Sequence, residues 1–125
     1  MSNDGLAQFA NQKYLNLESY RGNGQGVRTP LWFVEDSRAL YFYTPAHSYK
    51  VKRIAANPRV RVVPCDMRGN VKGVWVDATA RRIYGEESRR ADELLDRKYG
   101  LAKRILNFLA RVRGRERAAF AIQID

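Results

Sequence analysis

The sequence has only one cysteine, Cys65, and one histidine, His47, among its 125 residues. A lone thiol forms no intramolecular disulfide, so we expect a cytoplasmic protein. One cysteine and one histidine are too few ligands for a zinc site, and we expect no metal. With a single histidine, the sequence also offers few candidates for a catalytic triad built on histidine.

Long apolar runs are missing as well. No stretch approaches the roughly 20 apolar residues that a membrane-spanning helix requires, and no charged and apolar signal peptide opens the chain. We therefore expect no membrane partner. Hydrophobic residues still make up 45% of the sequence and recur along its length, which predicts one folded domain over 1–125 rather than disorder.

Acidic residues are scarce relative to basic ones: 23 Lys and Arg face 13 Asp and Glu, for a net charge of +10. Residues 1–47 are balanced, with four of each sign, so the excess lies in 48–125. Seven basic residues face one acid in 48–72, and eight face one acid in 97–117. Such clusters indicate nucleic acid, a phosphorylated ligand or an acidic partner.

The hydrophobic pattern predicts a mainly β fold. Alternation and β-branched residues predict six strands, at 14–20, 27–34, 39–43, 59–63, 71–83 and 118–124. Helical spacing predicts a weak helix at 3–11, a short one at 47–56 and two more at 86–99 and 101–112. Few helices lie between strands, which favours an antiparallel sheet closed into a barrel with short peripheral helices.

Phosphate-binding chemistry gathers where the strand at 39–43 leads into the short helix. Thr44 and Ser48 supply hydroxyls, and Lys50 and Arg53 share a helix face three residues apart. Hydroxyls, cations and the free N–H groups of a helix start predict a phosphate pocket. The plainer alternative is a solvated basic helix face.

Aromatic residues flank this pocket in the sequence. Trp32, Tyr41 and Tyr43 could form a wall for a planar ring, although tryptophan is more often a core residue. With the phosphate pocket, such a wall would suit a phosphorylated aromatic cofactor.

This window resembles the flavin-binding core of the pyridoxamine 5′-phosphate oxidase superfamily of split β-barrels. The YT pair at 43–44, Ser48, Lys50 and the NPRV run at 57–60 match that core in order and spacing. Arg28 stands where the family has an arginine opening a cofactor-contacting strand segment. The TPLWF run, the long run over 48–73 with its PCDMRGNVKG end, and the RKYG at 97–100 are similar to the bacterial branch that uses the deazaflavin coenzyme F420.

The resemblance covers about residues 13–125 and implies a six-stranded split barrel that forms a homodimer, with cofactor sites between the subunits. It implies that Arg28, Thr44, Ser48 and Lys50, helped by Arg53, hold the phosphate and ribityl chain. The backbone of 29–32 would then lie along the ring. The full set of cofactor-binding residues that the resemblance implies is Arg28, Thr29, Pro30, Leu31, Trp32, Tyr43, Thr44, Ser48, Tyr49, Lys50 and Arg53.

Two positions depart from the oxidase pattern: Tyr49 and Phe33 stand where the oxidase has basic residues. The oxidase's C-terminal substrate-binding segment also has no counterpart here, so we expect a substrate other than pyridoxine phosphate. The resemblance implies an oxidoreductase that transfers hydride between coenzyme F420 or FMN and a small organic substrate. The choice of cofactor stays open, although the PCDMRGNVKG segment and the RKYG at 97–100 favour the deazaflavin.

Two alternatives belong to other classes. A carrier that binds flavin, deazaflavin or tetrapyrrole without turnover would also lack an identifiable general acid or base. A nucleic-acid-binding protein would explain the charge, but the sequence holds no recognised nucleic-acid-binding motif, and we expect no nucleic-acid partner.

Overall fold

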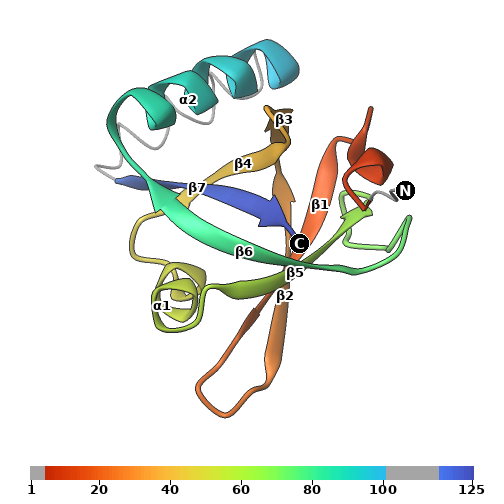
Figure 1. Cartoon of the computed structure of the whole chain (residues 1–125), viewed down its shortest axis with the longest axis vertical. Coiled ribbons are helices and arrows are strands. Elements are labelled where there is room, and N and C mark those ends of the chain that lie inside the picture. Colours follow the sequence, from red (N-terminus) through yellow and green to blue (C-terminus); the bar gives the residue numbers. More distant parts are fainter. Residues whose placement is uncertain (1–4, 101–115) are drawn as a thin grey trace.

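In the computed structural model, which describes residues 5–100 and 116–125, the strands form one sheet in the order β2-β1-β5-β6-β7-β4-β3 (Figure 1). Every neighbouring pair is antiparallel, so the predicted antiparallel β class is confirmed. The described part contains seven strands rather than the six predicted. The strands are β1 (Tyr14–Tyr20), β2 (Gly26–Trp32), β3 (Val34–Asp36), β4 (Ala39–Pro45), β5 (Arg59–Cys65), β6 (Val76–Ile83) and β7 (Arg117–Ile124). The helices are α1 (Tyr49–Ala56) and α2 (Gly85–Tyr99), preceded by a 3-10 turn, η1 (Ala7–Phe9).

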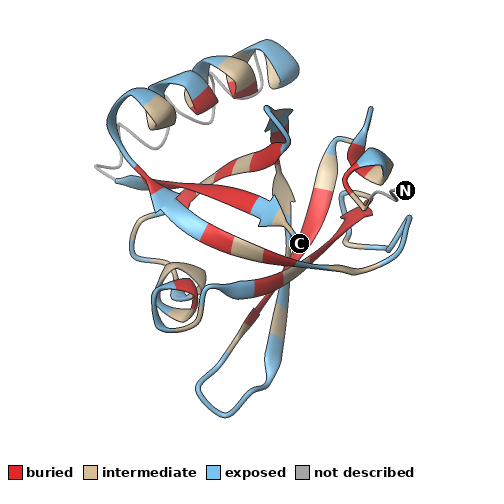
Figure 2. Cartoon of the chain, in the orientation of Figure 1, coloured by how far each residue is buried: buried red, intermediate tan, exposed pale blue. Residues whose placement is uncertain are grey.

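The sheet curls around one main core. Alternating residues of β1, β4, β5 and β7 turn inward, and β2 at one edge of the sheet comes close to β4 near the other. Figure 2 shows the buried residues following the strands, while the β1–β2 turn is exposed. Stacking of Phe42 on Phe120, with ring centroids 5.3 Å apart, joins β4 to β7 at the centre of this core. The core fixes the strand ends that carry the polar residues described below.

A second, smaller core lies between the sheet and α2. Ala119 and Ala121 of β7 pack there with Ile83 of β6 and Ala91 of α2. Their small side chains let the helix approach the sheet closely. The predicted helix end is confirmed, because Gly100 has a positive φ of 60° and its N–H donates to the carbonyl of Asp96. The helix predicted at 101–112 lies outside the described residues.

The extra strand arises because the predicted strand 27–34 breaks in two. β2 ends at Trp32, and β3 starts at Val34 and pairs with β4. Between them, the N–H of Phe33 donates to the Tyr99 hydroxyl at 2.9 Å, and its carbonyl accepts from Lys98 at 2.7 Å. The last turn of α2 therefore takes the bonds that a continuous strand would have used.

The predicted strand 71–83 is wrong over its first five residues. β6 begins only at Val76, and Val74, within the predicted strand, is 73% exposed. The backbone N–H and carbonyl of Val74 bond to the side-chain amide of Gln8 at 2.9 and 2.7 Å. A side chain distant in sequence thus replaces a neighbouring strand here.

None of the helices in the described ranges is long and apolar enough to cross a membrane.

Candidate functional site

A polar cluster joins the end of β4 to the start of α1. Thr44 is buried, and its hydroxyl accepts a hydrogen bond from the Lys50 ammonium at 3.0 Å. The hydroxyls of Thr44 and Ser48 lie 3.4 Å apart. Ser48 is the N-cap residue of α1, but its side chain makes no capping bond. The structure thus brings together three residues that the sequence predicted to bind phosphate.

Arg53 lies one helical turn beyond Lys50 and faces β1. Its Nε donates to the Ser19 hydroxyl at 2.7 Å. Beside it, a hollow of about 430 Å³ opens between the β1–β2 turn and α1, lined by Arg21, Gly22, Tyr49, Lys52 and Arg53. We call these five residues the basic hollow.

Among the described residues, the positive charges of this region are not neutralised by ion pairs with carboxylates. In the described part of the chain, no carboxylate forms an ion pair with Arg21, Lys50, Lys52 or Arg53. Burial and the charge of Arg53 lower the pKa of Lys50. Burial and the charge of Arg21 lower the pKa of Arg53 in turn. A bound anion would relieve this repulsion, so the donors fit a phosphate group.

Arg28 lies elsewhere. It pairs across β1–β2 with Glu18, whose carboxylate accepts from Arg28 and Arg61 at 2.8 Å each. Both guanidinium groups also lie over the Trp75 ring. Adjacent strand residues point to opposite faces, so Glu18 and Arg28 lie on the other face of β1 from Ser19 and Arg53. Within this chain, Arg28 is held by a carboxylate and does not join the Lys50 cluster. Its predicted role with the cofactor stays a prediction.

The other predicted residues of β2 divide between the two faces of the strand. Leu31 packs against the main core, and Thr29 shares its face. Pro30 is exposed opposite Asn16. β2 has β1 as its only described neighbour, so Pro30, which has no N–H to donate, lies on an edge strand, where proline is tolerated.

The aromatic side chains do not form one wall. Trp32 stacks on Tyr99 with ring centroids 4.6 Å apart and planes 9° from parallel. Tyr43 instead donates to the Ser88 carbonyl at 2.7 Å, and it packs with Tyr41 against the smaller core. Ser88 and Tyr99 are eleven residues apart on α2, or roughly 16 Å along the helix axis. Tyr49 is exposed at the rim of the basic hollow.

Sequence reasoning missed the connection between α2 and Phe33, although the RKYG motif at 97–100 supplies it. The Lys98 ammonium lies 3.7 Å from the Phe33 ring centroid, and burial lowers the pKa of Lys98 to about 8. Burial raises the pKa of the Tyr99 phenol, so the hydroxyl stays a hydrogen-bond donor. That hydroxyl lies 2.7 Å from the Phe33 carbonyl and 2.6 Å from the Lys13 carbonyl. α2 therefore fixes the end of the segment 29–32 that the resemblance places along the cofactor ring.

The remaining candidates carry little chemistry. His47 is exposed, while Cys65 is buried, and burial raises the pKa of its thiol. This makes Cys65 a poor nucleophile. Over residues 5–100 and 116–125, no three His, Cys, Asp or Glu side chains gather as metal ligands.

Replacing Tyr99 by phenylalanine is expected to lower the free energy of unfolding by about 1–2 kcal/mol, because the Phe33 N–H loses its acceptor. The ring stack on Trp32 stays in place. Urea unfolding measures the effect, and Tyr84→Phe is the matched control, since Tyr84 is exposed and no described group bonds to its hydroxyl. Equal losses in both variants would contradict the assigned role of Tyr99.

Solved structures with the same fold come from functionally diverse proteins. The heme storage protein HutZ from Vibrio cholerae aligns with a TM-score of 0.72 and 15% identity, over 92% of this chain and 83% of that one. A structure described as an F420 reductase aligns with a TM-score of 0.67 and 17% identity, over 100% and 96%. A FAD-binding protein from Mesorhizobium loti aligns with a TM-score of 0.63 and 20% identity, over 97% and 87%. None of the curated proteins matches the sequence significantly.

These likenesses define the class by its fold: a split β-barrel, shared with proteins that their descriptions connect to flavins, F420 or heme. The family model for pyridoxamine 5′-phosphate oxidase matches residues 4–124. The chain therefore belongs to the pyridoxamine 5′-phosphate oxidase family.

Proposed function

We propose that this protein is an oxidoreductase that transfers hydride between coenzyme F420 or FMN and a small organic substrate. The observation that carries the proposal is the Thr44–Ser48–Lys50 cluster next to Arg53. Two hydroxyls, an ammonium and a guanidinium that no carboxylate of the described residues pairs with suit the phosphate that both cofactors carry. The cofactor supplies the hydride chemistry when it is bound, while the chain binds and orients it and limits access of water.

Of the two cofactors, the basic hollow favours the deazaflavin. Arg21 and Lys52 extend the positive surface beyond the residues that one phosphate requires. Coenzyme F420 carries an acidic polyglutamate tail, which FMN lacks, and this tail would use those cations. Affinity should therefore rise with tail length at low salt, and the rise should shrink at high salt, because salt screens exposed charges. Calorimetry with F420 of several tail lengths at two salt concentrations measures this. An affinity that does not change with tail length at either salt concentration would favour FMN.

Turnover is tested with the purified protein. Its visible absorption shows whether it retains a flavin, and reduced F420 or FMN is then offered with quinones, nitro compounds or biliverdin as acceptors. Protein-dependent reoxidation with one acceptor class supports an enzyme. Tight cofactor binding with no acceleration for any acceptor would identify a carrier instead.

We also propose that the protein acts as a homodimer. Three of the five large apolar side chains exposed in the described part, Met67, Val71 and Val74, lie in the loop 67–74, and exposed apolar groups in one segment are typical of an interface. Val74→Glu should convert the dimer to a monomer in light scattering coupled to gel filtration. Tyr84→Glu makes the same kind of change at another exposed site and should leave a dimer. A monomeric wild-type protein at micromolar concentration would contradict the proposal.

A further inference from the structure

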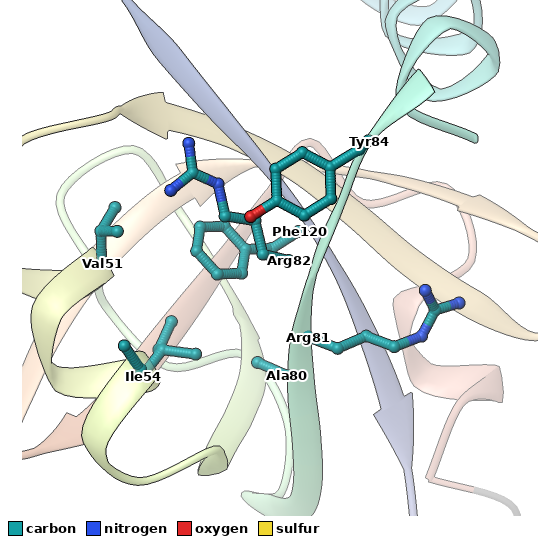
Figure 3. Close-up of a pocket in the computed structure, with 8 residues that line it drawn as sticks. Val51, Ile54, Ala80, Arg81, Arg82, Tyr84 and Phe120 are labelled. Atoms are coloured by element: carbon teal, nitrogen blue, oxygen red, sulfur yellow. The ribbon is translucent and has the colours of Figure 1, made fainter. Parts of the chain in front are cut away.

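A second hollow, of about 300 Å³, opens on the other side of α1, between this helix and β6 (Figure 3). Val51 and Ile54 of α1 line one wall, and Ala80 of β6 and Phe120 of β7 line the floor and opposite wall. Arg82 and Tyr84 stand at the rim. This volume lies at the lower end of the range for small-molecule sites.

Ala80 is the small β6 residue that lines the hollow. Ala78, Ala80 and Arg82 alternate onto the same face, and the two alanines are buried against the main core. Arg82 is the next residue on this face, at the rim of the hollow, and lies opposite Phe120 of β7 in the strand register. Alanine fills less space than the valines and leucines of the other strands. Phe120 is held in place by its stack on Phe42.

Arg82 gives this apolar hollow a positive end. Its guanidinium lies 5.4 Å from the Tyr84 ring centroid, and no carboxylate of the described residues pairs with it. The neighbouring Arg81 also lines the hollow, but its side chain extends away from Val51 and Ile54 in Figure 3 and forms an ion pair with Glu87. The two adjacent arginines thus differ: Arg81 is paired with a carboxylate, and Arg82 is not paired with any carboxylate of the described residues.

We propose that this hollow binds a small apolar carboxylate, such as an aryl-alkanoate or a short-chain fatty acid. The apolar part would lie against Val51, Ile54 and Phe120, and the carboxylate would accept hydrogen bonds from Arg82. The site is distinct from the proposed cofactor pocket, because Lys52 and Arg53 line the basic hollow instead. The proposal therefore does not depend on the cofactor.

Titration of ¹⁵N-labelled protein with 3-phenylpropionate, followed by amide chemical shifts, tests the proposal directly. We expect saturable shifts confined to 51–55, 80–84 and 118–121. The neutral analogue 3-phenyl-1-propanol should bind the same residues about tenfold more weakly, because it lacks the charge-assisted hydrogen bonds. Shifts mapping elsewhere, or equal affinity for acid and alcohol, would overturn the proposal.

Three variants test the roles of Arg82 and of the apolar wall separately. Arg82→Gln should remove the preference for the acid and leave the affinity for the alcohol within about twofold. Arg81→Gln makes the same change at the neighbouring residue and should keep the full preference. Val51→Phe should weaken both ligands by filling the hollow. If Arg82→Gln, with an otherwise unchanged spectrum, still binds the acid tenfold better, the assignment of Arg82 is wrong.

Discussion

Replacing Lys50 and Arg53 together by alanine is expected to weaken the binding of F420 or FMN by at least about 100-fold, since a hydrogen bond to a charged group contributes about 1.5–3 kcal/mol. Lys50 contacts the Thr44 hydroxyl and Arg53 contacts that of Ser19 one helical turn further on, and neither cation has a carboxylate partner in the described structure. Their charge is therefore available to a phosphate. Isothermal titration calorimetry at fixed salt measures the loss.

The matched control is Arg89→Ala with Arg90→Ala, which removes the same charge from the exposed side of α2, outside the proposed dimer interface. We expect its affinity to change by less than about threefold, because distant exposed charges are screened. Equal losses in the two double variants would show a general charge effect rather than a phosphate pocket. Thermal unfolding of both variants shows whether loss of the Arg53–Ser19 bond contributes.

Replacing Glu18 by alanine is expected to lower the free energy of unfolding by about 3 kcal/mol. Glu18 is 5% exposed and accepts hydrogen bonds from Arg28, Arg61 and Tyr20. Removing one partner of a buried ion pair costs about 3–5 kcal/mol, and the half-exposed arginines place the loss at the lower end. Urea unfolding measures it. Glu86→Ala, which removes an exposed carboxylate paired with Arg89, should change the free energy by less than about 1 kcal/mol.

The stabilising effect of Glu18 should also depend on pH. Burial alone would raise the pKa of Glu18, but hydrogen bonds from Arg28, Arg61 and Tyr20 outweigh it, and the pKa lies below the ordinary 4.5. The folded state therefore favours the charged form, so the contribution is complete above pH 4.5 and is lost as the pH falls through the folded pKa. The difference in unfolding free energy between wild type and Glu18→Gln should shrink between pH 6 and pH 3. A constant difference would contradict the proposed ion pairs.

Much of the fold could be predicted because its signals are local. The alternation over 14–20 and the helical spacing over 86–99 each depend on neighbouring residues, and the structure confirms both elements. The break at Phe33 and the late start of β6 could not be predicted. Each depends on a side chain 66 residues away, Tyr99 in one case and Gln8 in the other.

In the candidate site too, some features depend on neighbouring residues and others on residues distant in the sequence. Thr44, Ser48 and Lys50 lie within seven residues, and their spacing across a strand end and a helix start is enough to bring them together. Arg28 pairs with Glu18 through the strand register, which no local pattern reveals. The basic hollow likewise needs the β1–β2 turn to carry Arg21 to α1.

The most direct test of the proposed function is a calorimetric titration of the purified, cofactor-free protein with F420 and with FMN. The structure leads us to expect saturable binding of at least one of them, with one cofactor per chain and the 100-fold loss in the Lys50→Ala, Arg53→Ala variant. Binding of neither cofactor by folded protein would contradict the proposal, as would binding that this variant leaves unchanged.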